Sequence, residues 1–122
     1  MSDSLWMDIT TDDADGLADF YVNVMGWKKE AFDMGGYNDY VMMKEDGSPA
    51  GGICNKRGCN SSIPGGWVPY FTVAELDSAL AASKSAGGEQ IGDIRHHGTS
   101  RFCIIKDPSG ACCALYEQGE ES

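Results

Sequence analysis

Apolar residues alternate with other side chains at the start of the chain and then recur at a longer spacing. Leu5, Met7 and Ile9 alternate with their neighbours, which is the period of a β-strand with one buried face. Thr11–Asp13 supply side chains that cap a helix start, and Gly26 is typical of a helix end. The helical spacing between these signals predicts one buried stripe, formed by Leu17, Phe20, Tyr21 and Val24.

The same order of elements recurs in the second half of the chain. Alternation over residues 67–73 predicts a second strand, Glu75 gives an acidic helix start, and the glycine pair at 87–88 ends the helix. The predicted buried stripe of this helix is Leu76, Ala79, Leu80 and Ser83. A shift of about 62 residues lays Trp6 on Val68, so the sequence contains an internal repeat.

Three short strands are predicted after each helix, separated by turn residues such as those at 46–49 and 107–110. They fall at 28–33, 38–44 and 50–54 in the first half and at 90–95, 101–106 and 111–117 in the second half. Residues 55–66 lack periodicity and are interpreted as a linker, and 118–122 as a flexible tail. The chain is therefore one domain of two modules, 5–54 and 67–117.

Each module reads βαβββ, so the predicted fold class is α+β. A single βαβββ unit covers one face of its curled sheet with its own helix, and a second copy can cover the other face. We expect a curled mixed sheet whose two modules enclose a cup. Gly51 and Gly52 precede the apolar end of the last strand of the first module and would allow close backbone approach near that cup.

Charge and cysteine content exclude several classes of function. The net charge is −10, which argues against nucleic acid and anionic membrane surfaces and favours a cationic small molecule. The five cysteines are an odd number, and the chain opens with Met-Ser-Asp-Ser and no apolar stretch after it. We therefore expect reduced thiols, a cytoplasmic location and no membrane span.

Two segments carry a resemblance to a known family. WMDITTDDADGLADFYVNVMGW, with its Phe20-Tyr21 and Gly26-Trp27 pairs, resembles the start of glyoxalase/bleomycin resistance protein/dioxygenase (vicinal oxygen chelate) proteins. KDPSGACCALYE is similar to that family's closing hairpin and final strand. The resemblance covers about residues 5 to 117. It implies paired βαβββ modules, a ligand cup, a homodimer and often a divalent metal.

The resemblance also implies where metal ligands would stand. The matching positions are Trp6 and about Cys54 in the first module, and Val68 and Ala114 in the second. Three of these four side chains cannot coordinate a metal, which needs several converging donors. We therefore expect no metal, no cofactor, and neither glyoxalase I nor extradiol dioxygenase activity. His96 and His97 are neighbours whose side chains would point to opposite faces of a strand. With Arg95 and Arg101, which end and begin the flanking predicted strands, they surround a predicted loop that could recognise an anion or titrate near neutral pH, or could simply be an exposed charged loop.

The predicted cup is aromatic and apolar with a few polar groups, as small-molecule pockets usually are. Its candidate lining is Trp6, Asp8, Thr10, Val68, Tyr70, Thr72, Phe102, Cys112, Ala114 and Tyr116. Asp8 is the candidate for a general base or a cation ligand, and pairing with Arg101 or exposure at the rim are the alternatives. Trp6 and Tyr70 can equally fill the space as core. Trp67, Pro69 and Phe71 are expected to pack on the second module's own helix.

Three functions follow from these patterns. The first is binding of a small, largely apolar or cationic molecule in the aromatic cup without the family's metal. The second is a metal-independent isomerase or lyase that uses Asp8 or a cup tyrosine for proton transfer. The third is a structural module whose cup is plugged by its own side chains.

Overall fold

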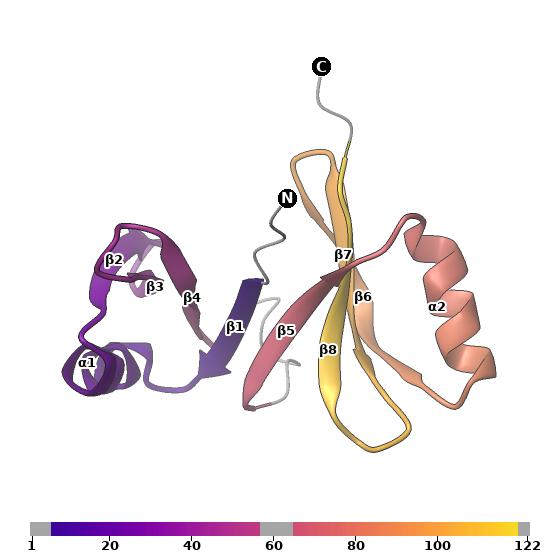
Figure 1. The fold of residues 1–122 in the computed structure, drawn as a ribbon, viewed down its shortest axis with the longest axis horizontal. Coiled ribbons are helices and arrows are strands. Elements are labelled where there is room, and N and C mark those ends of the chain that lie inside the picture. Colours follow the sequence, from indigo (N-terminus) through magenta and orange to yellow (C-terminus); the bar gives the residue numbers. More distant parts are fainter. Residues whose placement is uncertain (1–5, 57–64, 120–122) are drawn as a thin grey trace. The chain divides into compact units, whose positions relative to one another are not determined.

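The structure, a computed structural model, describes residues 6–56 and 65–119, which fall into two compact units (Figure 1). The first unit comprises the described residues up to Trp67, and the second comprises 68–119. The first unit carries β1 (Trp6–Thr11), α1 (Ala14–Met25), β2 (Lys28–Asp33), β3 (Asn38–Met43) and β4 (Pro49–Asn55). The second repeat consists of β5 (Trp67–Thr72), α2 (Leu76–Ser85), β6 (Glu89–His97), β7 (Ser100–Lys106) and β8 (Cys112–Glu117).

The element order confirms the predicted α+β fold with two βαβββ repeats. Most of the predicted linker, residues 57–64, and the end of the predicted tail, 120–122, lie outside the described residues. In the first unit the strand order is β2-β3-β4-β1, and in the second it is β5-β8-β7-β6. Each sheet is mixed, because the first and last strands of each repeat pair in parallel and the other pairs are antiparallel.

The parallel strand pairs of the two units have equivalent registers, related by the same 62-residue shift as the sequence repeat. Asp8 lies opposite Gly52 in the parallel pair β1–β4, and Tyr70 lies opposite Ala114 in β5–β8. Adding 62 to both residue numbers of the first pair gives the second pair. The equivalent of Ala114 is therefore Gly52, two residues before the Cys54 to which the sequence comparison had assigned that position.

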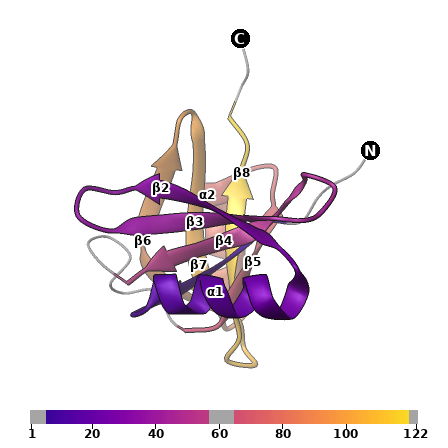
Figure 2. The same ribbon diagram turned by 90° about the vertical axis from the view of Figure 1, so that its left-hand side faces the viewer.

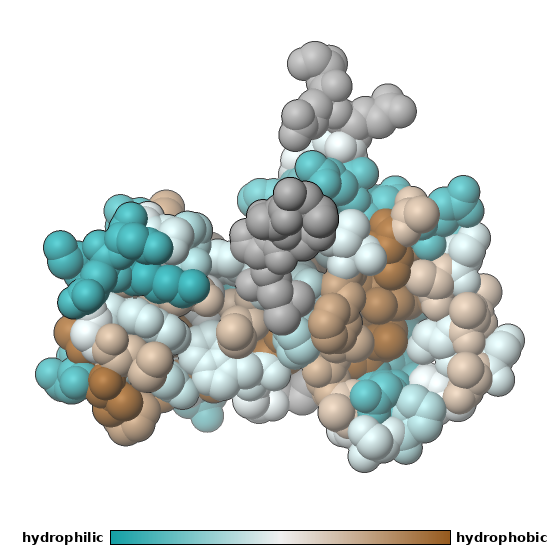
Figure 3. Space-filling model, in the orientation of Figure 1, coloured by the Kyte–Doolittle hydropathy of each residue, from teal (hydrophilic) through white to brown (hydrophobic). Residues whose placement is uncertain are grey.

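Helix α1 begins and ends as predicted, but its buried face is different. The Asp13 carboxylate accepts a hydrogen bond from the Gly16 backbone N–H at 3.0 Å, and Gly26 ends the helix with φ 72°. The fully buried residues are Ala14 and Ala18, whose small side chains let the helix lie close to the sheet. The predicted stripe is thus half wrong, because two of its members remain exposed. The exposed large apolar residues on α1 are Phe20, Val24 and Met25. Figure 3 shows the surface of the molecule coloured by hydropathy, with hydrophobic residues in brown.

The core of the first unit forms between α1 and one face of its sheet (Figure 2). Its buried members are Ala14, Ala18, Tyr40, Met42 and Ile53. Ile9 of β1 and Trp67 also pack against this cluster. The side chain of Trp67 donates a hydrogen bond from Nε1 to the Tyr21 hydroxyl at 3.0 Å. The expectation that Trp67 packs on the second module's helix is therefore wrong, because its ring joins the aromatic residues of α1 instead.

Helix α2 confirms its predicted stripe, because Leu76 is fully buried and Ala79, Leu80 and Ser83 are half-buried. Glu75 occupies the N-cap position but its side chain makes no capping hydrogen bond. The cap comes from β8, where the Glu117 Oε1 accepts a hydrogen bond from the Leu76 backbone N–H at 2.7 Å. The opposite-face residue Phe71, also expected to pack on this helix, is 47% exposed.

Strands β6 and β7 are longer than predicted and leave only a tight turn between them. His96 pairs with Arg101 and His97 with Ser100, and Gly98 turns the chain with φ 61°. The predicted loop is therefore shorter than expected: His96 and His97 belong to β6, while Arg95 and Arg101 lie in the strands predicted for them. The polar character of the two histidines suggested a loop, but backbone pairing of β6 with β7 continues through them.

The hairpin turns of the two repeats use the same chemistry. In the β3–β4 turn, Asp46 Oδ1 accepts hydrogen bonds from the backbone N–H and the hydroxyl of Ser48, at 2.9 and 2.6 Å. In the β7–β8 turn, Asp107 Oδ1 accepts the same pair of bonds from Ser109, at 2.8 and 2.6 Å. These hydrogen bonds lower the pKa of both carboxyl groups. An Asp followed two residues later by Ser thus fixes each turn.

Neither helix in the described part of the chain is long and apolar enough to cross a membrane.

Candidate functional site

The face of the first-unit sheet that points away from α1 carries the polar side chains of β1. Ile9 packs against the α1 core, so strand alternation places Trp6, Asp8 and Thr10 on the other face. The Trp6 indole donates a hydrogen bond from Nε1 to Asp8 Oδ1 at 2.7 Å. Asp8 is half-buried and Thr10 is buried. The indole thus fixes the position of the carboxylate on this face.

Two glycines of β4 let this pair lie against the backbone. A β-carbon at Gly52 would be 2.5 Å from Asp8 Oδ1 and 3.3 Å from the Trp6 ring. A β-carbon at Gly51 would be 2.7 Å from the backbone oxygen of Met7. The predicted close backbone approach is therefore present, and Gly52 is the residue on which Asp8 lies.

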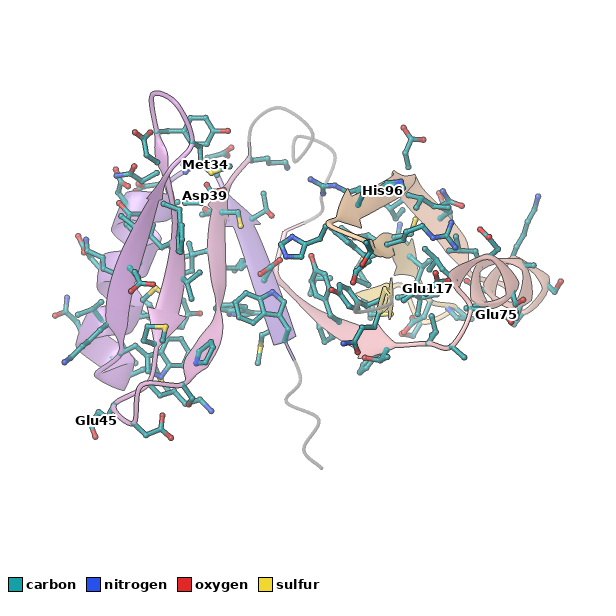
Figure 4. The ribbon with its side chains drawn as sticks, turned by 90° about the horizontal axis from the view of Figure 1, so that it is seen from above. Met34, Asp39, Glu45, Glu75, His96 and Glu117 are labelled. Atoms are coloured by element: carbon teal, nitrogen blue, oxygen red, sulfur yellow. The ribbon has the colours of Figure 1, made fainter. Side chains whose placement is uncertain are left out.

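Asp8 was considered as a partner for Arg101, but that guanidinium binds elsewhere. Arg101 Nη2 lies 3.1 Å from Glu117 Oε1 and 3.3 Å from Asp77 Oδ2, on the face of the second-unit sheet that carries α2. Figure 4 labels Glu117 beside Glu75 and the start of α2. The hydrogen bond from the Leu76 backbone and the one from Arg101 lower the pKa of Glu117. Arg101 and Glu117 therefore join β7 and β8 to the start of α2.

The other face of the second-unit sheet carries a cluster of three aromatic rings from three strands. Because Arg101 and Glu117 face α2, their neighbours Phe102 and Tyr116 face away from it. The ring centroid of Tyr70 lies 5.4 Å from that of Phe102 and 6.5 Å from that of Tyr116. Phe102 and Tyr116 are directly opposite in register and nearly parallel, with centroids 6.3 Å apart. These contacts define the aromatic cluster.

Arg95 extends the cluster with a positive charge. Its guanidinium carbon lies 5.6 Å from the centroid of the Phe102 ring, within the range of a cation–π interaction. Arg95 lies on β6 opposite Phe102 in register. The sequence did not connect Arg95 with the candidate lining, because Arg95 stood at the end of its predicted strand, beside the charged loop. The next residue, His96, is exposed and is labelled in Figure 4.

The remaining candidate lining residues differ in exposure. Val68 and Ala114 are buried and lie in the same strands as Tyr70 and Tyr116, while Thr72 at the end of β5 is exposed. Cys112 is half-buried and pairs with Lys106 at the other end of β8. The structure therefore brings three predicted residues together as rings in the second unit, and two others as the Trp6–Asp8 pair in the first.

A pocket that the sequence did not indicate lies between α2 and the β6–β7 side of the second-unit sheet. Its lining is Leu80, Ser83, Lys84, Gly88, Glu89, Gln90 and Ile105. It contains none of the predicted lining residues. A β-carbon at Gly88 would be 2.3 Å from the Ser83 hydroxyl oxygen, so this glycine keeps the end of α2 close to the strand.

The residues at the implied metal positions do not fit a divalent metal ion. Trp6 offers only an indole N–H, which already donates to Asp8, and the buried Val68 and Ala114 have no donor atoms. Gly52, which corresponds to Ala114 by register, has no side chain. In the described residues as a whole, no group of three or more His, Cys, Asp or Glu side chains is arranged to hold a metal.

Sequence comparison identifies one superfamily. A sequence model of the Glyoxalase/Bleomycin resistance protein/Dioxygenase superfamily matches residues 4–112. The anthracycline biosynthesis protein DauV of Streptomyces sp. (strain C5) is 24% identical over 127 aligned positions, covering 93% of this chain and 46% of DauV. The chain thus spans about half the length of this curated relative.

Solved structures share the fold at low sequence identity. A glyoxalase/bleomycin resistance protein/dioxygenase superfamily member from Vibrio splendidus 12B01 has a TM-score of 0.63 at 10% identity, over 94% of this chain and 98% of that one. The Streptomyces coelicolor methylmalonyl-CoA epimerase has a TM-score of 0.53 at 18% identity, over 94% and 96%. At such identities the similarity establishes the fold and not the activity.

Proposed function

Because the chain belongs to the Glyoxalase/Bleomycin resistance protein/Dioxygenase superfamily, we propose that it binds a small, largely apolar or cationic molecule without the family's metal. The observation that carries this proposal is the aromatic cluster of Tyr70, Phe102 and Tyr116. Three half-buried rings on the sheet face away from α2, two of them nearly parallel, offer an apolar surface against which a planar ligand can pack.

The charge of the protein supports a cationic ligand. The chain carries a net charge of −10, which raises the local concentration of cations. We propose that the aromatic cluster recognises the planar part of the ligand and that the negative charge of the protein attracts its cationic group.

The relative DauV, named for anthracycline biosynthesis, suggests a class of planar ligand. Anthracyclines combine a planar polycyclic ring system with an amino sugar that is protonated at neutral pH. The planar ring system matches the aromatic cluster, and the protonated amine matches the negative charge of the protein. We therefore propose planar, polycyclic aromatic molecules, with or without an amino group, as the ligand class.

Titration with doxorubicin, an anthracycline whose ring system fluoresces, tests this proposal. We expect saturable quenching of its fluorescence and a rise in the melting temperature of the protein, because a ligand that binds only the folded state stabilises it. Phe102→Ala should weaken binding about 10-fold or more, the loss expected when a stacking partner worth about 1–2 kcal/mol is removed.

Phe71→Ala is the matched control. Phe71 is on β5 next to Tyr70, but it points to the opposite face and is 47% exposed. Its removal should leave doxorubicin binding unchanged. Absence of quenching and of a thermal shift across doxorubicin and a panel of cationic polycyclic aromatics would contradict the proposal. An equal loss of binding in Phe71→Ala and Phe102→Ala would contradict the assigned surface.

Two further measurements test the charge and the metal independence. A rise in salt concentration screens charges and should weaken the binding of doxorubicin more than that of a neutral aglycone of the same ring system. Binding should be the same before and after treatment with a chelator. Tight, stoichiometric retention of zinc, nickel, manganese or iron by the purified protein would overturn the metal-free part of the proposal.

A further inference from the structure

The pocket between α2 and the β6–β7 side of the sheet has a filled counterpart in the first unit. It lies where the C-terminal half of α2 meets these two strands (Figure 1). The 62-residue shift that relates the two repeats places three of its polar lining residues, Ser83, Lys84 and Glu89, on apolar residues of the first unit, which are Tyr21, Val22 and Trp27. The two units therefore differ in chemistry at this end of the helix.

In the first unit, apolar side chains close this position. Tyr21 and Trp27 stack with their ring centroids 5.7 Å apart and an interplanar angle of 20°. Both rings and Val22 pack against the buried core of the unit. In the second unit a hydroxyl, an ammonium group and a carboxylate take the places of these side chains. The pocket therefore corresponds to the space that the two rings occupy in the first unit.

The rest of the lining is largely apolar. Ile105 is 8% exposed and Leu80 is half-buried, and both line the pocket. The volume is about 280 Å³, which is below the roughly 300–1,000 Å³ of sites for drug-sized ligands. Apolar side chains beside an unfilled space lack packing contacts that a bound molecule can supply. The pocket therefore suits a small molecule with an apolar part.

Two opposite charges line the same pocket. Lys84 lies on the last turn of α2, and Glu89 is the first residue of β6. Both are exposed, and within residues 6–56 and 65–119 neither forms an ion pair with another side chain. The Gln90 side chain donates from Nε2 to the Gly92 carbonyl oxygen at 2.8 Å, which leaves its amide oxygen as a further acceptor. The pocket thus combines one cation and one anion with apolar side chains.

We propose that this pocket binds a small zwitterion with an apolar body, which is the chemistry of a free α-amino acid with an aliphatic or aromatic side chain. Glu89 receives the ammonium group, Lys84 receives the carboxylate, and the apolar body packs on Leu80 and Ile105. A zwitterion satisfies both protein charges at once, whereas a molecule with a single charge leaves one of them without a partner. The pocket is on the sheet face that carries α2, so this inference is independent of the ligand proposed for the aromatic cluster.

Nuclear magnetic resonance titration of the isotope-labelled full chain with L-phenylalanine tests the proposal. We expect saturable chemical-shift changes at the backbone amides of Lys84, Gly88, Glu89 and Ile105. Phenethylamine lacks the carboxylate and phenylpropionate lacks the ammonium group, so each should bind at least about 3-fold more weakly, the loss expected for one exposed ion pair. Glycine keeps both charges but has no apolar body and should also bind more weakly.

Substitution of the charged residues tests the same contacts from the side of the protein. Glu89→Gln and Lys84→Met each remove one charge at similar side-chain size and should weaken L-phenylalanine binding by about 3-fold or more. Glu45→Gln is the matched control, because Glu45 is an exposed carboxylate of the first unit (Figure 4). It changes the net charge by the same amount as Glu89→Gln and should leave binding unchanged.

Transfer of the first-unit rings into the second unit gives a further test. Ser83→Tyr combined with Glu89→Trp should fill the pocket, abolish the chemical-shift changes and raise the melting temperature. The proposal would be overturned by an absence of changes at the pocket amides, or by equal binding of L-phenylalanine and its two singly charged analogues. An equal loss of binding in Glu45→Gln and Glu89→Gln would overturn it as well. None of these outcomes alters the response expected for doxorubicin.

Discussion

The two units have the same element order and the same register, yet they place different chemistry at equivalent positions. Asp8 and Gly52 lie opposite each other in the first unit, and Tyr70 and Ala114 take their places in the second. The first unit therefore carries the Asp8 carboxylate against the backbone of Gly52, and the second unit carries Tyr70, one ring of the aromatic cluster. The backbone pattern therefore sets positions only, and the residue types decide what each face can bind.

The largest difference between the units should appear in their cores. Ile53 is fully buried against Ala18 and Met42, whereas its counterpart Leu115 is only half-buried. We expect Ile53→Ala to lower the free energy of unfolding by roughly 2–5 kcal/mol and Leu115→Ala by about 1–2 kcal/mol. Urea denaturation of both variants measures the difference. Equal losses would show that the two cores are equally well packed.

The glycines of β4 should be nearly as sensitive, but for two different reasons. A β-carbon at Gly51 meets the backbone oxygen of Met7, and one at Gly52 meets the carboxylate of Asp8. Each alanine substitution should cost about 1–3 kcal/mol. In an Asp8→Ala background the cost of Gly52→Ala should fall, while that of Gly51→Ala should persist. A double-mutant cycle checks this, and an unchanged cost at Gly52 would contradict the observed contact.

The N-caps of the two helices should differ less in their contribution to stability than the two cores do. Helix α1 is capped by its own Asp13, so Asp13→Ala should destabilise the protein by about 1 kcal/mol. The equivalent position of α2 is Glu75, which makes no capping hydrogen bond. Glu75→Ala should therefore have a smaller effect in thermal denaturation. A larger loss from Glu75→Ala than from Asp13→Ala would mean that the second helix depends on its own cap after all.

The smallest expected effect is a pH-dependent change in stability at Glu117, the β8 residue that caps the start of α2. Hydrogen bonds from the Leu76 backbone and from Arg101 hold the pKa of Glu117 below its ordinary value. The stabilisation is present above the carboxyl group's unfolded pKa and is lost as the pH falls through the lower folded-state pKa. Glu117→Gln should melt at a lower temperature than the wild type at neutral pH, and the two melting temperatures should converge as the pH falls below the folded-state pKa of Glu117. A difference that persists at acid pH would point to packing rather than charge.

The sequence predicted those features that follow from local patterns. Strand alternation, the capping residues and the 62-residue offset gave the βαβββ repeat and the buried face of α2. The buried face of α1 was misjudged because bulky apolar residues compete with Ala14 and Ala18, and close helix–sheet packing favours the alanines. The apolar pattern of the sequence does not distinguish small from bulky residues, so it could not predict that the alanines would be the buried ones.

The candidate site was only partly accessible from sequence for a related reason. The three rings of the aromatic cluster could be assigned to one face because alternation orders residues within each strand. Arg95 was missed because its contact with Phe102 depends on the pairing of β6 with β7, whose register shifts between Ile91 and Arg95 in a way that no local pattern encodes. The hydrogen bond from Trp6 to Asp8 depends on a rotamer, which no periodicity encodes.

The matching turns at Asp46–Ser48 and Asp107–Ser109 bear on the order of folding events. Each turn closes a hairpin across a few residues, whereas the parallel pairs join strands at opposite ends of a repeat. Short loops close faster because they lose less chain entropy. The β3–β4 and β7–β8 hairpins should therefore nucleate each repeat, and β1 and β5 should dock onto them late.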